Sequence, residues 1–298
     1  MRRREFAELV VILAAVGLVS TLLVRRSSIQ KSALATPRPP TSLLSARIEL
    51  TGDWDQDLRR AAGQVLERAR QACLGDIRLV SDRQPGWLRV EESSGTPAIW
   101  LHPDDPGMAW IIVNIGERDW SKLAYQFGHE LGHVFANSWQ RDDKPSLPCQ
   151  WLEEALVEAF SLRGLGLLAA GWKKNPPFAG DGAFGDAIAR YRENIVREYA
   201  SLADSQGLTH DAEAWFADHR AEIEAGGLVP YGQAMAGVLL SEFEAEPDCV
   251  EAIGALNRWP GRTAVPIADY LRRWESSCEE LEASVRLPMR LRELLKLS

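Results

Sequence analysis

The chain has 298 residues, enough to bury one substantial core or two small ones. With 46% hydrophobic and 26% charged residues, its composition is that of an ordinary globular protein. The net charge of −8 argues against nucleic-acid binding, which usually requires a basic surface.

The amino terminus carries an apolar run, residues 6–24, with arginines on both sides. This length is just sufficient to span a bilayer, and we expect residues 1–26 to form a single-pass membrane anchor. A cleaved signal peptide with a small-residue site at Ala33-Leu34-Ala35 is the alternative; the length of the run and the cations that follow it favour the anchor. Residues 27–45 are rich in Ser, Thr and Pro, which indicates an extended linker. We place the folded part, residues 46–298, outside the cytoplasm.

The first part of the folded region, residues 46–139, predicts a small mixed sheet and two helices. Apolar spacing indicates a helix over residues 54–74. Short β-branched or alternating stretches, separated by Gly, Pro and Ser turns, predict strands at 46–50, 76–80, 87–91, 98–101 and 110–115. His102 falls in a turn-rich loop, where we expect a surface position. Asp119 is the predicted N-cap of the next helix.

That next helix contains His129-Glu130-Leu131-Gly132-His133, a His-Glu-x-x-His motif. Histidines four residues apart leave the same face of a helix, so both imidazoles can bind one metal ion. Glu130 can reach a metal-bound water and accept its proton. Leu123, Phe127, Leu131 and Val134 form an apolar stripe at helical spacing, which supports the helical assignment.

The third metal ligand is predicted on the following helix, around residues 151–160. The alternative extension, with a glycine at position 136 and a histidine at position 139, is excluded by Ala136 and Trp139. A glutamate completes the other common set of two histidines and one carboxylate, and Glu154 is our choice. Glu153 is the fallback, because helix phase is easily misjudged by one residue. Glu158 lies one turn beyond Glu154, where a carboxylate could orient a metal-bound histidine.

Residues 140–298 are predicted to be mainly helical. A Pro-containing loop joins the two motif helices, a Gly- and Pro-rich connection covers 171–185, and helical patterns follow at 187–202, 212–224, 231–244, 249–257, 267–278 and 281–295. The four widely spaced cysteines are compatible with one or two disulfides or with four buried thiols.

The paired motifs His129-Glu130-Leu131-Gly132-His133 and Trp151-Leu152-Glu153-Glu154-Ala155 resemble those of the gluzincin metallopeptidases, especially their aminopeptidase group in the peptidase MA superfamily. The resemblance implies that His129, His133 and Glu154 bind Zn²⁺ and that Glu130 is the general base. Val229-Pro230-Tyr231 resembles the segment whose tyrosine stabilises the tetrahedral intermediate, which implies this role for Tyr231; His210 and His219 are the alternative donors. The aminopeptidase motif Gly-x-Met-Glu-Asn is absent from the sequence, so the resemblance does not extend to exopeptidase specificity.

Together these patterns predict an α+β, zincin-like fold: an N-terminal transmembrane helix, a small mixed sheet with helices, and a mainly helical carboxy-terminal region. The expected function is zinc-dependent hydrolysis of peptide bonds in a peptide or protein substrate by a membrane-anchored enzyme. In the resembling family an edge strand of the sheet pairs with the extended substrate. A catalytically inactive, zinc-stabilised binding module tethered to the membrane is the alternative.

Overall fold

The computed structural model describes residues 42–297 except 103, 117 and 227. The predicted membrane anchor and nearly all of the predicted linker lie outside these residues. The elements of the sheet half are β1 (Arg47–Gly52), α1 (Gln56–Leu74), β2 (Trp87–Glu92), β3 (Ala98–Ile99), β4 (Met108–Val113) and α2 (Trp120–Phe135). The helical half contains α3 (Gln150–Lys174), α4 (Phe184–Ser205), α5 (Ala212–Glu224), α6 (Leu228–Ala245), the 3-10 helix η1 (Pro247–Ala255), α7 (Ile267–Glu280) and α8 (Arg286–Leu294). The described chain is therefore α+β, with a small mixed sheet followed by a mainly helical part.

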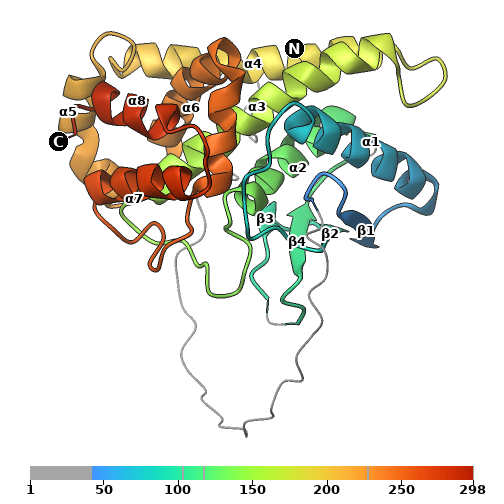
Figure 1. Ribbon diagram of the computed structural model, residues 1–298. Helices are drawn as coiled ribbons and strands as arrows, with labels where there is room; N and C mark the ends of the chain where they lie inside the picture. Colours follow the sequence, from blue (N-terminus) through green and yellow to red (C-terminus); the bar gives the residue numbers. More distant parts are fainter. Residues whose placement is uncertain (1–41, 103, 117, 227, 298) are drawn as a thin grey trace, which may run out of the picture.

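The four-stranded sheet has the order β1-β2-β4-β3. β1, β2 and β4 are parallel, and only the short edge strand β3 is antiparallel to its neighbour. Alternate residues of the two central strands are buried, including Leu88, Val90, Ile111 and Val113. Because side chains alternate between the faces of a sheet, this set marks the face on which α1 and α2 pack (Figure 1).

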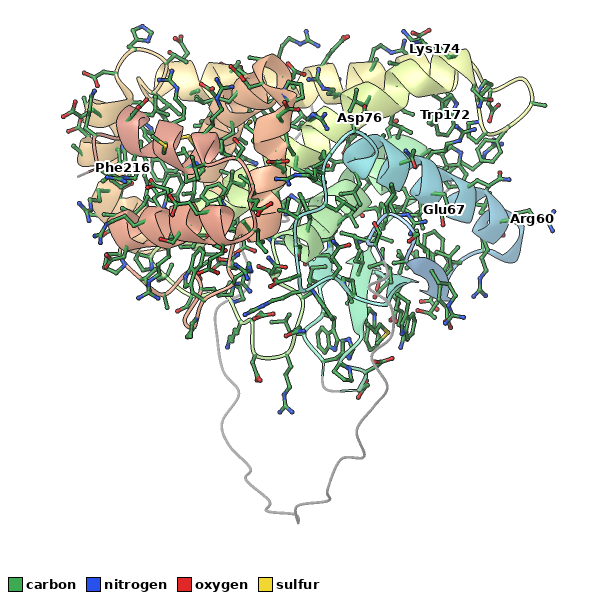
Figure 2. The ribbon with its side chains drawn as sticks, in the orientation of Figure 1. Arg60, Glu67, Asp76, Trp172, Lys174 and Phe216 are labelled. Atoms are coloured by element: carbon green, nitrogen blue, oxygen red, sulfur yellow. The ribbon has the colours of Figure 1, made fainter. Side chains whose placement is uncertain are left out.

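The long helix α3 passes through the centre of the molecule and joins its two halves (Figure 1). It contacts α1 and α2 on the sheet side and α4 and α6 on the other. Figure 2 shows Lys174 at its carboxy-terminal end on the side of α1, whereas Phe216 of α5 lies at the opposite side of the molecule. Among the described residues, α3 is the one helix long and apolar enough to cross a bilayer, but 78% of its most apolar window is buried inside the fold. That burial is typical of a core helix.

Two glycines of the predicted metal helix let α3 approach α2 closely. A Cβ atom added to Gly132 would lie 2.8 Å from Cβ of Val157, and one added to Gly128 would lie 2.9 Å from Oγ of Ser161. Both distances are shorter than a normal van der Waals contact. The glycines, poor helix formers by themselves, therefore permit the close helix crossing that brings α3 up to the histidine-bearing face.

We expect Gly132→Ala to destabilise the fold. Replacing a helical glycine by alanine gains about 1 kcal/mol in helix propensity. Overpacking a tight core contact costs about 1–3 kcal/mol, and here the obstructing atom is the Cβ of Val157, which cannot move without its backbone. Urea unfolding of Gly132→Ala should therefore show a loss of up to about 2 kcal/mol.

Gly171→Ala is the matched control, because this glycine is exposed on α3 and an added Cβ would meet nothing within 4 Å. The control should be as stable as the wild type or more stable by up to about 1 kcal/mol. Equal stabilisation of both variants would contradict the close-packing explanation.

Several sequence predictions need correction. Residues 76–80 are not a strand: Arg78 pairs instead with Glu251 at 3.0 Å, and Val80 packs beside Gly254 of η1. The expected helix over 249–257 is a 3-10 helix, and the first residues of the predicted 171–185 connection belong to α3. His102 is buried, not exposed, and its Nε2 lies 3.3 Å from the Met108 carbonyl oxygen. All four cysteines are free, buried thiols, as one of the two alternatives predicted.

Candidate metal centre

α2 presents His129 and His133 on one face. The helix begins after Asp119, whose side chain accepts a hydrogen bond from the Lys122 backbone N–H at 3.1 Å, as expected of an N-cap. Four residues make about one helical turn, so the two imidazole rings are neighbours, with centroids 5.1 Å apart. The local sequence alone is sufficient to produce this pair.

Glu154 comes from α3 and lies between the two imidazoles. Its Oε2 is 3.3 Å from Nε2 of His129 and 3.4 Å from Nε2 of His133. The candidate ligand atoms of these three residues all lie within 4.8 Å of one another. Zinc binds imidazole nitrogen and carboxylate oxygen at about 2.0–2.2 Å, and a tetrahedral arrangement at these lengths separates neighbouring ligand atoms by about 3.3–3.6 Å. The donor set and the two Nε2–Oε2 distances therefore fit one zinc ion.

Each imidazole is held on its other side by a separate carboxylate of α3. Nδ1 of His129 lies 2.8 Å from Oε2 of Glu158, and Nδ1 of His133 lies 2.8 Å from Oε1 of Glu153. Because a carboxylate only accepts, Nδ1 donates in both rings, and Nε2 is the nitrogen left for a metal. Glu158 thus occupies the orienting position expected for it. Glu153 does not take the ligand position; it orients the second histidine.

The charges of the metal-free centre follow from the close approach of several carboxylates to the two buried histidines. Burial by itself lowers the pKa of both histidines, but the surrounding carboxylates outweigh it: the pKa of His133 rises to about 9 and that of His129 lies well above its usual value. For Glu154, burial opposes ionisation, but the two histidines hold its pKa well below the ordinary range. A metal ion binding at the two Nε2 atoms would therefore displace imidazolium protons.

The Glu158 carboxylate is itself fixed by two tyrosines. Its Oε1 accepts hydrogen bonds from the hydroxyl of Tyr125 at 2.6 Å and from that of Tyr199 at 2.9 Å. Tyr125 lies one turn before His129 on α2, and this spacing places both on one face of the helix. Tyr199 comes from α4, and no local pattern links it to the motif. Sequence analysis missed four side chains that hold the orienting carboxylates: Tyr125, Tyr199, Asn257 and Arg262.

Glu130 points away from the solvent and is buried. Burial raises the pKa of its carboxyl group, while the charges of His129 and His133 and a hydrogen bond from the Ile99 backbone act in the opposite direction. Ile99 belongs to the edge strand β3, so the residue predicted to be the general base lies between the histidines and the edge of the sheet.

Tyr231 and the two alternative oxyanion donors lie in the helical half. The Tyr231 hydroxyl donates a hydrogen bond to Glu222, and its ring packs against His219 with centroids 5.0 Å apart. His210 is largely exposed and contacts the neighbouring Thr209. The hydrogen bonds of Tyr231 and His210 in this structure are thus made with residues outside the His129–His133–Glu154 group.

The three candidate ligands are partly open to solvent. The exposed side-chain fractions are 14% for His129, 13% for His133 and 25% for Glu154. A metal held by these three residues would keep a position that faces solvent. Comparison of the chain with protein-family models, with curated proteins and with solved structures found no match.

Proposed function

We propose that this chain is a zinc-dependent peptidase of the gluzincin type, in which His129, His133 and Glu154 bind Zn²⁺ and Glu130 is the general base. The observation that carries the proposal is the convergence of two imidazole Nε2 atoms on one Glu154 oxygen, with each Nδ1 held by its own carboxylate. A pair of core histidines without a metal would need a hydrogen-bond partner for each ring but not a third glutamate between the two Nε2 atoms.

The partial exposure of the three ligands favours catalysis over a structural role. Structural zinc sites usually have four protein ligands and are closed, whereas catalytic sites keep one position for water or substrate. Among the described residues, the group of potential ligands contains three members. When bound, zinc would lower the pKa of a water molecule and polarise the scissile carbonyl.

The protein's own residues would then accept the proton of the attacking water and transfer it. Glu130 accepts the proton of the attacking water and passes it to the leaving amine, for which a buried carboxyl with a raised pKa is well suited. Glu158 and Glu153 keep the imidazoles in the orientation that directs Nε2 at the metal. The Ile99 backbone lies beside Glu130 and moderates the rise of its pKa.

An extended peptide is the substrate that the surroundings favour. β3 is an edge strand with one neighbour, and edge strands present unpaired backbone groups to which another strand can add. The contact between the Ile99 backbone and Glu130 brings this edge close to the proposed base. We keep residues 6–24 as the proposed bilayer anchor, and we propose that the peptidase lies on the extracytoplasmic side of the membrane.

The experiment that tests the function uses the chain from residue 42 onward, which keeps the fully buried Leu43. Near one zinc per chain by elemental analysis, together with cleavage of a mixture of unstructured peptides, is the expected result. Zinc without any cleavage would instead support the alternative, a zinc-stabilised binding module.

Tyr231→Phe is expected to lower turnover by about 10²–10³-fold without loss of zinc, if the hydroxyl leaves Glu222 and donates to the developing oxyanion. Substrate binding should change little, because this hydrogen bond strengthens only as charge develops. The measurement is kcat and KM on one cleaved peptide. If Tyr231→Phe turns over at the wild-type rate, Tyr231 is not the hydrogen-bond donor to the oxyanion. His210 and then His219 are the next candidates.

A further inference from the structure

Glu153 is a fully buried carboxylate that accepts hydrogen bonds from three residues, which belong to two distant parts of the chain. One oxygen accepts from Nδ1 of His133 at 2.8 Å. The other accepts from Nη2 of Arg262 at 2.6 Å and from Nδ2 of Asn257 at 3.0 Å. His133 lies on α2 and Glu153 on α3, while the other two residues belong to the segment after η1. The rotamer of Glu153 is therefore fixed by a segment distant in sequence.

The backbone conformation and the hydrogen bonds of Asn257 direct its side-chain amide toward Glu153. Its φ of +56° is in the left-handed region, which asparagine tolerates better than most residues. The Tyr270 hydroxyl donates to its Oδ1 at 3.1 Å, so the amide is oriented with Nδ2 toward Glu153. Asn137, just after α2, donates in return to the Leu256 carbonyl at 2.7 Å. These bonds tie the end of the metal helix to the segment that carries Asn257.

Arg262 is buried and forms an ion pair with Glu153 at 2.6 Å. It is 5% exposed, and its one side-chain hydrogen bond within the described residues goes to Glu153, while its buried Nε and Nη1 atoms have no protein partner. Burying a guanidinium for one contact is costly. The carboxylate on the other side of the centre, Glu158, is held by two neutral phenols instead. The carboxylate behind His133 is thus paired with a cation, whereas the carboxylate behind His129 accepts hydrogen bonds from two hydroxyl groups.

We infer that Arg262 and Asn257 are positioning residues of the metal centre, which act on His133 through Glu153. Without the guanidinium, Glu153 would be a buried carboxylate that has lost its ion pair with Arg262, and it would turn toward other donors or water. His133 would then lose the acceptor that fixes its ring, and its Nε2 would no longer be held toward Glu154. The inference rests on the proposed zinc site and extends it to a segment with no recognisable motif.

The test measures zinc affinity by competition with a chelator of known affinity, together with the visible absorption spectrum of the Co²⁺-substituted protein. Glu153→Gln is expected to weaken zinc binding by about 10–100-fold, as is typical for loss of a carboxylate behind a histidine ligand. Arg262→Met should weaken it by about 10-fold or more and shift the cobalt bands. The double variant, Glu153→Gln with Arg262→Met, should bind zinc no more weakly than the single variant with the lower zinc affinity. Both changes interrupt the same chain of contacts to His133.

Arg258→Met is the matched control. Arg258 lies in the same segment and forms ion pairs with Asp82 and Glu280, at 2.8 and 2.9 Å, without touching Glu153. Its zinc affinity should stay within about twofold of the wild type. Arg262→Lys restores the positive charge and should recover part of the affinity.

Wild-type zinc affinity and an unchanged cobalt spectrum in Arg262→Met would overturn the role of Arg262, as would fully additive losses in the double variant. If Arg262→Met does not fold by circular dichroism, Asn257→Gly decides, since glycine keeps the left-handed backbone and removes only the side chain. A several-fold weaker zinc affinity in Asn257→Gly supports the inference, and an unchanged one contradicts it. A wild-type protein that binds no zinc would refute the proposed function itself.

Discussion

Replacing His129 and His133 together by alanine is expected to reduce bound zinc from near one ion per chain to none. The change removes both nitrogen ligands and leaves Glu154 as a single carboxylate, which cannot retain zinc against a buffer. Elemental analysis after gel filtration gives the stoichiometry. Chelation of the wild-type protein should abolish hydrolysis, and added zinc should restore it.

His219→Ala is the control for the double variant. This histidine lies on α5, where it packs against Trp215 and Tyr231, and it does not belong to the proposed ligand group. Its zinc content should equal that of the wild type. Full zinc retention by the double variant would refute the site.

Loss of the proposed base in Glu130→Gln is expected to reduce turnover by about 10²–10⁴-fold. Glutamine has the same size and keeps an oxygen that can accept the hydrogen bond from the Ile99 backbone, so the local structure should persist. It cannot accept the proton of water. Zinc content should therefore remain near one per chain while hydrolysis of the same peptide nearly ceases.

An exposed carboxylate provides the comparison. Glu279→Gln removes one negative charge from the surface of α7, away from any contact with the metal ligands, and should leave turnover unchanged. A fully active Glu130→Gln enzyme would show that this residue does not activate water. Loss of zinc in Glu130→Gln would show instead that the carboxylate has a structural role in the site.

Local patterns were sufficient for much of the fold. The helices α1, α5 and α7 lie close to their predicted limits, and α2 begins after its predicted N-cap, Asp119. Residues 76–80 have the same kind of apolar alternation as a strand yet form none. A strand requires a paired neighbour, and here Arg78 and Val80 find partners in η1 instead.

Sequence reasoning also anticipated that His129, His133 and Glu154 form one group of potential metal ligands. A spacing of four residues in a helix is enough to bring His129 and His133 together, whatever the rest of the chain does. The choice between Glu153 and Glu154 as the third ligand depends on the rotational phase of α3, that is, on which of its sides faces α2. Adjacent helical positions differ by about 100°, so the angle at which α3 crosses α2 decides which carboxylate faces Nε2 and which faces Nδ1.

Tertiary structure alone decided how those carboxylates are held. Arg262 and Asn257 reach Glu153 from more than a hundred residues further along the chain, and Tyr199 reaches Glu158 from α4. Such contacts have no periodicity to reveal them. They exist because Gly132 permits the close crossing of α2 and α3, which buries the glutamates away from water. A buried carboxylate must find donors within the fold, and only the packed arrangement determines which donors are within reach.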